Sequence, residues 1–375
     1  MKKERLLLLG GLSQSLVNFR GPLIQEAVRR GFEVVAVANE PDERVYTTLK
    51  SWGATFVPLK LSRTVMNPWN DLLTIKRLIT LLKTVKPDVF IGYALKPVTY
   101  GLLAARIAGI PHRYAMITGL GYAFTEGSEA KRTLARIVSS AAYKIGLRFA
   151  DGVVFQNQED LAEFRERDFI SNSQRTLRVQ GTGVDLTFFR QTPLPNGHTK
   201  FLMIARLLKD KGIYEYVEAA RIAKRSNPEL TFILAGPLDL NPTSIKKMEV
   251  DKWVREGSID YRGPLDDVRP LINECHVYVL PSYREGMPRT VQEAMAMGRP
   301  VITTDSVGCR DTVTPHKNGL LVPPASAKEL SRAMEYLDVN RHLLKDMGNA
   351  SAIHARTVFD ANMIASEVMN FIQEP

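Results

Sequence analysis

The stretch Pro281–Val301, PSYREGMPRTVQEAMAMGRPV, decides the fold class because it holds the junction between a strand and a helix. The apolar run His276–Pro281 predicts a buried strand that ends where this stretch begins. The loop after it contains Gly286, and Pro288 suits the first turn of a helix because its missing N–H needs no partner there. Since the first N–H groups of a helix attract phosphate oxygens, the junction predicts a loop that holds a diphosphate.

Two carboxylates, Glu285 and Glu293, lie eight residues apart across this junction. Glu285 is expected in the loop, near a bound ligand, and Glu293 is expected one turn into the helix. A buried carboxylate at that position can accept two hydroxyl hydrogen bonds from a ribose. Each residue also has a simpler interpretation: Glu285 fits a solvated loop acid, and Thr290-x-x-Glu293 fits a capping box.

A second group of charged residues follows the predicted strand Phe201–Ala205, in the order Arg206…Lys211-Gly212. Arg206 offers a planar donor pair for phosphate oxygens, and Lys211 adds a compact positive charge. Gly212 permits a sharp entry into the next helix. The same pattern is also typical of an ordinary charged surface loop, so its spacing alone is a weak signal.

Short apolar runs alternate with helix-length amphipathic stretches along the whole chain, which predicts parallel sheets covered on both faces. The remaining strand-like runs are Arg5–Leu9, Glu33–Ala38, Thr55–Leu59, Asp88–Gly92, Arg113–Thr118, Gly152–Gln156, Leu177–Gln180, Thr231–Ala235, Val301–Thr304 and Gly319–Pro323. The alternation pauses at Asp185–Thr199, where Pro193, Pro195, Asn196 and Gly197 indicate a linker. We therefore expect an α/β protein with two doubly wound Rossmann-like domains facing across a cleft.

The expected domain boundaries follow from that pause. Residues 1–187 form the first domain and residues 199–357 form the second. A last amphipathic stretch lies within residues 358–375, and it either completes the second domain or packs back on the first. In such sheets, ligands bind at the carboxyl ends of the strands.

Composition and charge narrow the function further. Of the 375 residues, 50 are Lys or Arg and 40 are Asp or Glu; residues 1–190 hold 27 basic and 17 acidic residues, and residues 191–375 hold 23 of each. The basic first half is expected to meet an anionic partner, or to be merely a solvated surface. The two cysteines are too few for a disulfide framework, which favours the cytosol. No segment is long and apolar enough to predict a membrane span.

Several nucleotide and metal motifs are absent from the sequence. Gly10-Gly11 lacks the G-x-G-x-x-G spacing, which disfavours NAD, although Gly11 permits close approach to some ligand. There is no D-x-D, no Walker motif and no histidine spacing typical of a metal site. We therefore expect neither a cofactor nor a metal. Residues 131–149 form a basic amphipathic stretch that suits anionic lipid or an ordinary surface helix.

Taken together, these motifs resemble family 4 glycosyltransferases of the GT-B fold, a group of retaining, metal-independent enzymes. The resemblance rests on Glu285-x7-Glu293, on Gly298-Arg299-Pro300-Val301 and on Arg206…Lys211-Gly212. It implies that Glu285, Arg206 and Lys211 are catalytic, with the two cations neutralising the diphosphate that leaves. The donor-binding residues that we expect are Gly11, Arg206, Lys211, Glu285, Gly286, Met287, Pro288 and Glu293.

The first half resembles a subgroup of bacterial N-acetylgalactosaminyltransferases that act on undecaprenyl-diphosphate-linked sugars. The acceptor-side residues that this resemblance implies are Asn18, Arg20, Lys96, Thr118, Gly119 and Gly121. Leu95-Lys96 stands where many members carry a histidine, which draws attention to Lys96. The resemblance implies a hexose or N-acetylhexosamine donor, for which the subgroup favours UDP, and a polyprenyl-diphosphate-linked acceptor. It also implies a cytoplasmic enzyme bound peripherally to the cytoplasmic face of the inner membrane.

Two other functions remain compatible with the sequence. A UDP-sugar 2-epimerase on the same fold would use two cleft carboxylates and histidines, which the Arg206, Lys211, Glu285 and Glu293 set fits less well. A basic nucleic-acid-binding protein would agree with the charge excess. No helix-turn-helix or aromatic-interleaved basic strand supports the latter, so we expect no nucleic-acid partner.

Overall fold

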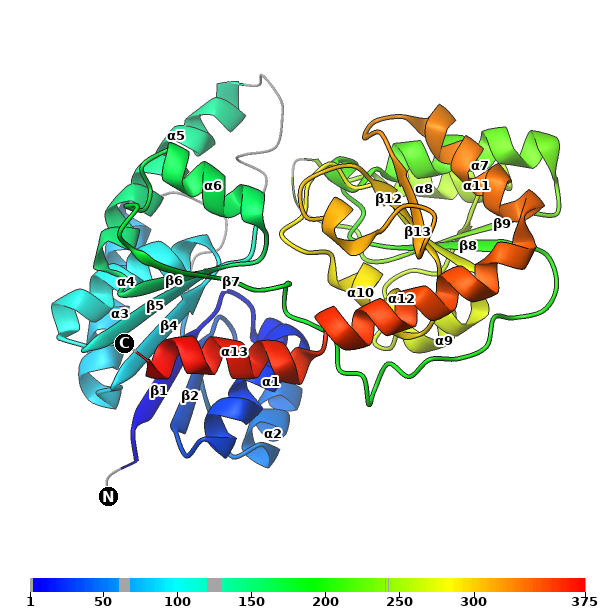
Figure 1. The fold of residues 1–375 in the computed structure, drawn as a ribbon. Coiled ribbons are helices and arrows are strands. Elements are labelled where there is room, and N and C mark those ends of the chain that lie inside the picture. The colour runs from blue at the N-terminus through cyan, green and yellow to red at the C-terminus, as the bar shows by residue number, and fades with distance from the viewer. Residues whose placement is uncertain (1–2, 61–67, 120–129, 240, 242, 375) are drawn as a thin grey trace. The chain divides into compact units, whose positions relative to one another are not determined.

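The computed structural model describes residues 3–60, 68–119, 130–239, 241 and 243–374 (Figure 1). The chain divides into two compact units: unit 1 is Met1–Thr182 with Ala361–Pro375, and unit 2 is Gly183–Asp360. Each unit has one parallel sheet with helices on both faces. The prediction of two doubly wound α/β units is therefore confirmed.

Unit 1 contains a seven-stranded sheet in the order β3-β2-β1-β4-β5-β6-β7. Its strands are β1 (Arg5–Leu9), β2 (Glu33–Ala38), β3 (Thr55–Pro58), β4 (Val89–Tyr93), β5 (His112–Ile117), β6 (Gly152–Phe155) and β7 (Arg175–Arg178). Its helices are α1 (Ser13–Arg29), α2 (Glu43–Ser51), α3 (Pro68–Val85), α4 (Leu95–Ala108), α5 (Ala130–Gly146), α6 (Gln158–Glu166) and α13 (Ala361–Gln373). Because side chains alternate along a strand, Leu6 and Leu8 enter one core and Leu7 and Leu9 enter the other.

Helix α13 completes unit 1 although it follows unit 2 in the sequence. Figure 1 shows it in red against α1 in blue. Its apolar face, with Ile364, Val368 and Met369, joins the core under β1 and β2. Tyr114 donates to the carbonyl of Ile372 at 2.9 Å, which fixes the end of the helix on β5. The sequence had left the position of this helix open.

Unit 2 contains a six-stranded sheet in the order β10-β9-β8-β11-β12-β13. Its strands are β8 (Lys200–Ile204), β9 (Thr231–Ala235), β10 (Asp260–Tyr261), β11 (Val277–Leu280), β12 (Val301–Thr304) and β13 (Gly319–Val322). Its helices are α7 (Ile213–Ser226), α8 (Lys247–Arg255), α9 (Arg269–Glu274), α10 (Arg289–Ala296), α11 (Ala327–Val339) and α12 (Leu344–Val358). The strands are buried on both faces, which explains their nearly continuous apolar sequences.

The proline-rich segment 185–199 packs on unit 2. Arg299, which is fully buried, donates to the carbonyl of Thr192 at 3.0 Å and to its hydroxyl at 2.8 Å. A third hydrogen bond, at 2.9 Å, joins Arg299 to the carbonyl of Ile272. A buried guanidinium needs such partners, so the Arg299 of the Gly-Arg-Pro-Val motif holds this segment against the domain.

The structure also corrects two details of the predicted strands. The strand expected at Leu177–Gln180 is β7, Arg175–Arg178, and the two-residue β10 gave no recognisable pattern in the sequence. Both lie at sheet edges, where fewer apolar residues are needed. No helix in the described part of the chain is long and apolar enough to cross a membrane.

Candidate functional site

In unit 2, the order of the strands creates a switch point at the carboxyl ends of β8 and β11. The chain runs from β8 outward to β9 and β10, and from β11 outward to β12 and β13 on the other side. The connections therefore leave β8 and β11 in opposite directions. Such a switch point is where ligands bind in open α/β sheets. Both predicted donor loops start here, one after each strand.

The loop after β8 carries Arg206 and Lys211. The guanidinium of Arg206 pairs with Asp239 at 3.0 Å and remains 58% exposed. Gly212 ends the loop with φ +75°, and a Cβ there would lie 2.1 Å from the carbonyl oxygen of Pro281. Glycine is needed for this close approach, which brings the loop after β8 against the loop after β11.

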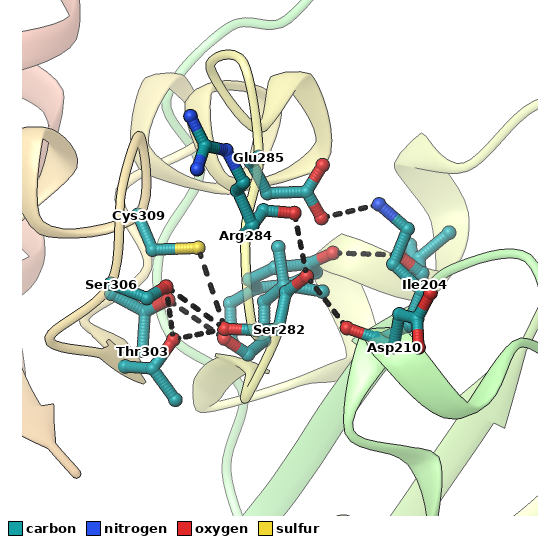
Figure 2. Close-up of polar contacts among 12 residues, drawn as sticks. Ile204, Asp210, Ser282, Arg284, Glu285, Thr303, Ser306 and Cys309 are labelled. Carbon is teal, nitrogen blue, oxygen red and sulfur yellow. Dashed lines mark hydrogen bonds and ion pairs between the residues drawn. The ribbon is translucent and has the colours of Figure 1, made fainter. Parts of the chain in front are cut away.

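The loop after β11 is held by hydrogen bonds to Ser282 (Figure 2). The hydroxyl of Ser282 donates to the carbonyl of Asp210 at 3.2 Å, and its carbonyl accepts from the hydroxyl of Ser306 at 3.0 Å. The hydroxyl of Thr304 donates to the same carbonyl. Figure 2 shows Ser282 between Asp210 and Ser306, so the three loops at this edge are tied through one residue.

The loop after β12 supports Glu285 directly. The backbone N–H of Glu285 donates to the carbonyl of Val307 at 3.0 Å. Gly308 has φ +74°, and a Cβ there would lie 2.5 Å from the carbonyl oxygen of Glu285 and 2.6 Å from that of Gly286. Cys309 is buried beneath, and burial raises the pKa of its thiol to about 11, with the carboxylate of Glu285 adding to the rise. Glu285 is therefore positioned by backbone contacts on both sides.

Lys211 and Glu285 form an ion pair across the switch point. Both side chains are largely buried, with 20% and 15% of their surfaces exposed. The pair joins the loop after β8 to the loop after β11, which Figure 2 shows as a dashed line from the Glu285 carboxylate. The two predicted catalytic residues that lie 74 positions apart in sequence are thus in contact.

Helix α10 begins at the switch point after an N-cap residue that makes no side-chain cap hydrogen bond. Its N-cap is Pro288, and its first turn starts at Arg289. The backbone N–H groups of this turn point out of the carboxyl edge of the sheet, where they favour an anion. Gly286 and Met287 are buried in the preceding loop. A second helix, α7 (Ile213–Ser226), starts after Gly212 in the loop that follows β8, so two helices begin at this edge of the sheet.

Glu293 lies in the second turn of α10 and is buried. Its carboxylate pairs with Arg289 at 2.9 Å. Burial raises the pKa of Glu293, and the positive charge of Arg289 opposes that rise. The capping-box interpretation is wrong, because α10 starts at Arg289 and its N-cap makes no side-chain hydrogen bond. Because Glu293 is a buried carboxylate that does not cap the helix, it is a candidate for contact with a ligand.

Unit 1 has a switch point of its own, between β1 and β4. Gly10 packs on Tyr93, since a Cβ at Gly10 would lie 2.1 Å from the Tyr93 hydroxyl, whereas a Cβ at Gly11 would meet nothing within 4 Å. The fold thus requires Gly10, and the space beside Gly11 is open to a ligand. After β4, Ala94 has φ +71° and leads into α4, which carries Lys96 in its first turn.

The ammonium of Lys96 pairs with Asp71 of α3 at 2.9 Å, and both side chains are nearly buried. Tyr100 donates to the other oxygen of Asp71 at 3.0 Å. Burial raises the pKa of Tyr100 to about 12, and the hydrogen bond to Asp71 adds to the rise. Lys96 and Asp71 therefore form a charged cluster at the sheet edge. Sequence reasoning did not single out Asp71.

The other predicted acceptor residues differ in their surroundings. Asn18 is exposed on α1, while Arg20 is buried with its guanidinium 4.6 Å from the centre of the Tyr93 ring. Thr118 and Gly119 follow β5 and are partly buried, with Gly119 at φ +114°. Gly121 lies outside the described residues.

Sequence reasoning missed the groups that hold the site in place. These are Asp239, which pairs with Arg206, the Ser306–Gly308 loop, and Asp71. For the Ser306–Gly308 loop, the one signal available in the sequence was the glycine four residues after the strand Val301–Thr304. In the described part of the chain, no group of three or more His, Cys, Asp or Glu side chains is arranged to hold a metal ion.

Two protein-family models match the chain, one in each half. Residues 20–179 match the model described as "Glycosyl transferase 4-like domain", and residues 185–353 match the model described as "Glycosyl transferases group 1". The second match contains Arg206, Lys211, Glu285 and Glu293.

Individual proteins agree with these matches. The chain is 29% identical, over 97% of both chains, to the N,N'-diacetylbacillosaminyl-diphospho-undecaprenol alpha-1,3-N-acetylgalactosaminyltransferase of Campylobacter jejuni. It is 25% identical, over 67% of its own length and 66% of the relative, to the UDP-Gal:alpha-D-GlcNAc-diphosphoundecaprenol alpha-1,3-galactosyltransferase of Escherichia coli. Among solved structures, sucrose-phosphate synthase of Thermosynechococcus elongatus is similar over 99% of both chains, with a TM-score of 0.81 and 18% identity.

Proposed function

We propose that this chain, a glycosyltransferase of the GT-B fold whose two halves match the glycosyl transferase 4-like and group 1 models, uses a UDP-linked hexose or N-acetylhexosamine as its donor. Its proposed acceptor is a saccharide carried on a polyprenyl diphosphate. The relatives whose names state their substrates act on diphospho-undecaprenol saccharides, and one of them uses UDP-Gal. The reaction would extend a lipid-linked glycan.

The observation that carries the proposed donor site is the contact between Lys211 and Glu285 at the switch point of unit 2. Departure of a nucleoside diphosphate requires stabilisation of developing negative charge. Lys211, the exposed guanidinium of Arg206 and the N-terminus of α10 supply positive charge or aligned N–H groups at the same edge. Glu293 would accept the ribose hydroxyls. No protein metal ligand is needed for this chemistry.

Glu285 is proposed to face the donor sugar, with Gly286 and Met287 placing backbone groups beside it. In the retaining reaction that we propose, the acceptor hydroxyl attacks the anomeric carbon from the face that the diphosphate leaves. The leaving phosphate oxygen takes the proton of that hydroxyl as the new glycosidic bond forms. Because Lys211 pairs with Glu285 before the donor binds, the donor diphosphate would share this lysine with the carboxylate.

A peripheral position at the membrane follows from the proposed acceptor, whose polyprenyl chain is anchored there. Helix α5 offers a suitable surface in unit 1. Ile137 and Ile145 are 60% and 55% exposed on it, and Arg136, Lys144 and Arg148 flank them as exposed cations. Such a basic amphipathic helix binds anionic lipid headgroups and inserts its apolar side chains shallowly.

A thermal-shift screen against UDP-, GDP- and dTDP-sugars tests the proposed donor. A ligand that binds only the folded protein raises the melting temperature by mass action. UDP-sugars are expected to stabilise the protein, and Lys211→Ala should remove most of that effect. Stabilisation by GDP- or dTDP-sugars alone would contradict the UDP assignment. Conversion of a UDP-sugar to its 2-epimer without an acceptor would contradict the transferase proposal.

A further inference from the structure

A cavity of about 710 Å³ lies in unit 1 at the carboxyl ends of β2 and β3, with Pro41, Pro58 and Leu73 forming the apolar part of its lining. Its volume is in the range of sites for small molecules. The polar residues that line it are Asn39, Glu40, Lys60, Asn70, Thr74 and Arg77. Because the strands of the sheet are parallel, the cavity opens at the same edge as the switch point between β1 and β4.

The corner after β2 holds a strained residue in this cavity. Glu40 has φ +66°, which is unfavourable for any residue with a Cβ. The hydroxyl of Ser13, at the start of α1, donates to the carbonyl of Glu40 at 2.6 Å and also contacts the carbonyl of Asn39. The side chain of Glu40 is exposed at the cavity, and that of Asn39 is buried beside it. Strain that the surrounding structure maintains is typical of ligand-binding positions.

Two cations, Lys60 and Arg77, line the cavity together with this acid. Arg77 of α3 donates to the backbone carbonyl of Lys60 at 3.4 Å, so the two residues are neighbours in the lining. Neither cation has a carboxylate within ion-pair distance among the residues that the structure describes. Two unneutralised cations beside hydroxyl and amide groups match a saccharide that carries an anionic group.

Helix α3 connects the cavity to the Lys96 cluster. Asn70 and Thr74 line the cavity, while Asp71 between them pairs with Lys96 of α4. Both surfaces therefore belong to the first turns of one helix. A ligand that reached from the cavity to Lys96 would meet three cations along this edge: Lys60, Arg77 and Lys96.

We propose that this cavity is the subsite for the diphosphate end of the acceptor, with Lys60 and Arg77 binding the diphosphate and the Asn39–Glu40 corner binding the hydroxyls of the first sugar. The assignment rests on the proposed function for the nature of the acceptor. Two cations bind a diphosphate through charge-assisted hydrogen bonds, and a carboxylate accepts hydrogen bonds from sugar hydroxyls.

Calorimetric binding to two probes tests the role of the cations. One probe is N-acetylglucosaminyl diphosphate with a ten-carbon isoprenoid tail, and the other is the allyl glycoside of the same sugar, which has no phosphate. Lys60→Gln and Arg77→Gln should each weaken binding of the diphosphate probe about tenfold or more. Neither variant should change the affinity for the allyl glycoside.

Lys76→Gln is the matched control, because Lys76 is exposed on the same helix but does not line the cavity. This control should bind the diphosphate probe as the unmodified protein does. The assignment is wrong if all three variants bind that probe equally, or if the unmodified protein does not bind it. If the probe binds as expected while no nucleotide-sugar supports transfer, the proposed function fails and the diphosphate subsite stands.

The variant Glu40→Gly distinguishes a role of the Glu40 side chain in ligand binding from a role in the fold. Glycine accepts a positive φ without cost, so the melting temperature should stay the same or rise. Loss of the carboxylate should still weaken binding of both probes. A variant with a lower melting temperature and unchanged affinities would mean that Glu40 serves the fold alone.

Discussion

Lys211 has two potential partners at the switch point of unit 2, the carboxylate of Glu285 and the diphosphate of the donor. Its ammonium contacts Glu285 in the structure. Lys211→Ala should weaken UDP binding by about 1.5–3 kcal/mol, the loss expected for a hydrogen bond to a charged group. Calorimetric titration with UDP measures this loss. Lys209→Ala, two residues earlier in the same loop, is the control, and an equal loss in both variants would contradict a specific role for Lys211.

Glu285 is held by the backbone contacts of Val307 and Gly308, so its side chain can be changed without loss of the loop. Glu285→Ala and Glu285→Gln should lower kcat by roughly 100-fold or more, the size of effect seen when an electrostatic contact to a transition state is removed. Both variants should still fold, with a lower melting temperature because Lys211 loses its largely buried ion-pair partner. Normal turnover in both variants would show that the reacting centre lies elsewhere.

Glu293 provides a pH-dependent prediction. Burial raises its pKa, so the folded state binds a proton more readily than the unfolded state does. The free energy of unfolding that Glu293 contributes is therefore greatest below the ordinary glutamate value and falls as pH rises through the raised pKa. Glu293→Gln should remove this fall and should also weaken UDP binding. Thermal denaturation between pH 4 and pH 8 measures the effect, and identical pH profiles would contradict it.

At the scale of single residues, the sequence identified chemistry better than surroundings. Arg206, Lys211 and Glu285 were singled out because their residue types and order suggest a diphosphate site, and their roles stay a prediction. Their supports, Asp239 and Gly308, act through contacts between loops that are distant in sequence, and no local pattern reveals such contacts. The capping-box interpretation of Glu293 was wrong because the start of a helix depends on backbone geometry that a four-residue motif does not determine.

Helix α13 packs in unit 1, although the residues that precede it in the sequence belong to unit 2. Val368→Asp would place an unpaired charge in the core of unit 1, where Val368 is 1% exposed. We expect a loss of about 4 kcal/mol and a fall in melting temperature of roughly 10 °C. Met363→Asp is the control, because Met363 is 59% exposed on the same helix. Equal melting temperatures for the two variants would contradict the packing of α13.

Helix α5 carries the prediction about the membrane. Vesicles with and without 30% anionic phosphatidylglycerol provide the comparison, and the protein should sediment only with the anionic ones. A double substitution of Ile137 and Ile145 by serine should reduce this binding, and salt should weaken it because surface charges are screened. Equal sedimentation with neutral vesicles, or no effect of the two serines, would contradict a docking role for α5.

Periodicity predicted most elements because buried parallel strands are nearly continuous apolar runs. The strands Glu33–Ala38 and Val301–Thr304 have the bounds that the sequence indicated. The position of α13 could not be predicted, since an amphipathic helix fits any complementary apolar surface. The periodicity of apolar residues predicts which face of a helix is buried, but it does not predict which surface that face packs against.

At the scale of the whole molecule, the positive charge is distributed unevenly between the two halves of the chain. The excess of basic residues lies in residues 1–190, whereas residues 191–375 are balanced. We propose that the balanced half binds the donor through a few aligned groups, and that the basic half meets a lipid-linked diphosphate and the membrane that carries it. That the chain is a glycosyltransferase follows from the sequence and from the family models that match its two halves, whereas the choice of sugar is set by the shape of the loops around the site.

The most direct test of the account is the mass of the product formed by the full chain. The protein is incubated with UDP-N-acetylgalactosamine, UDP-N-acetylglucosamine, UDP-galactose or UDP-glucose and with a short-chain polyprenyl diphosphate saccharide. We expect that one of these donors adds a single hexose or N-acetylhexosamine to the acceptor, with release of one UDP and an α-linkage retained from the donor. Release of UDP without any gain in acceptor mass, or a β-linked product, would contradict it.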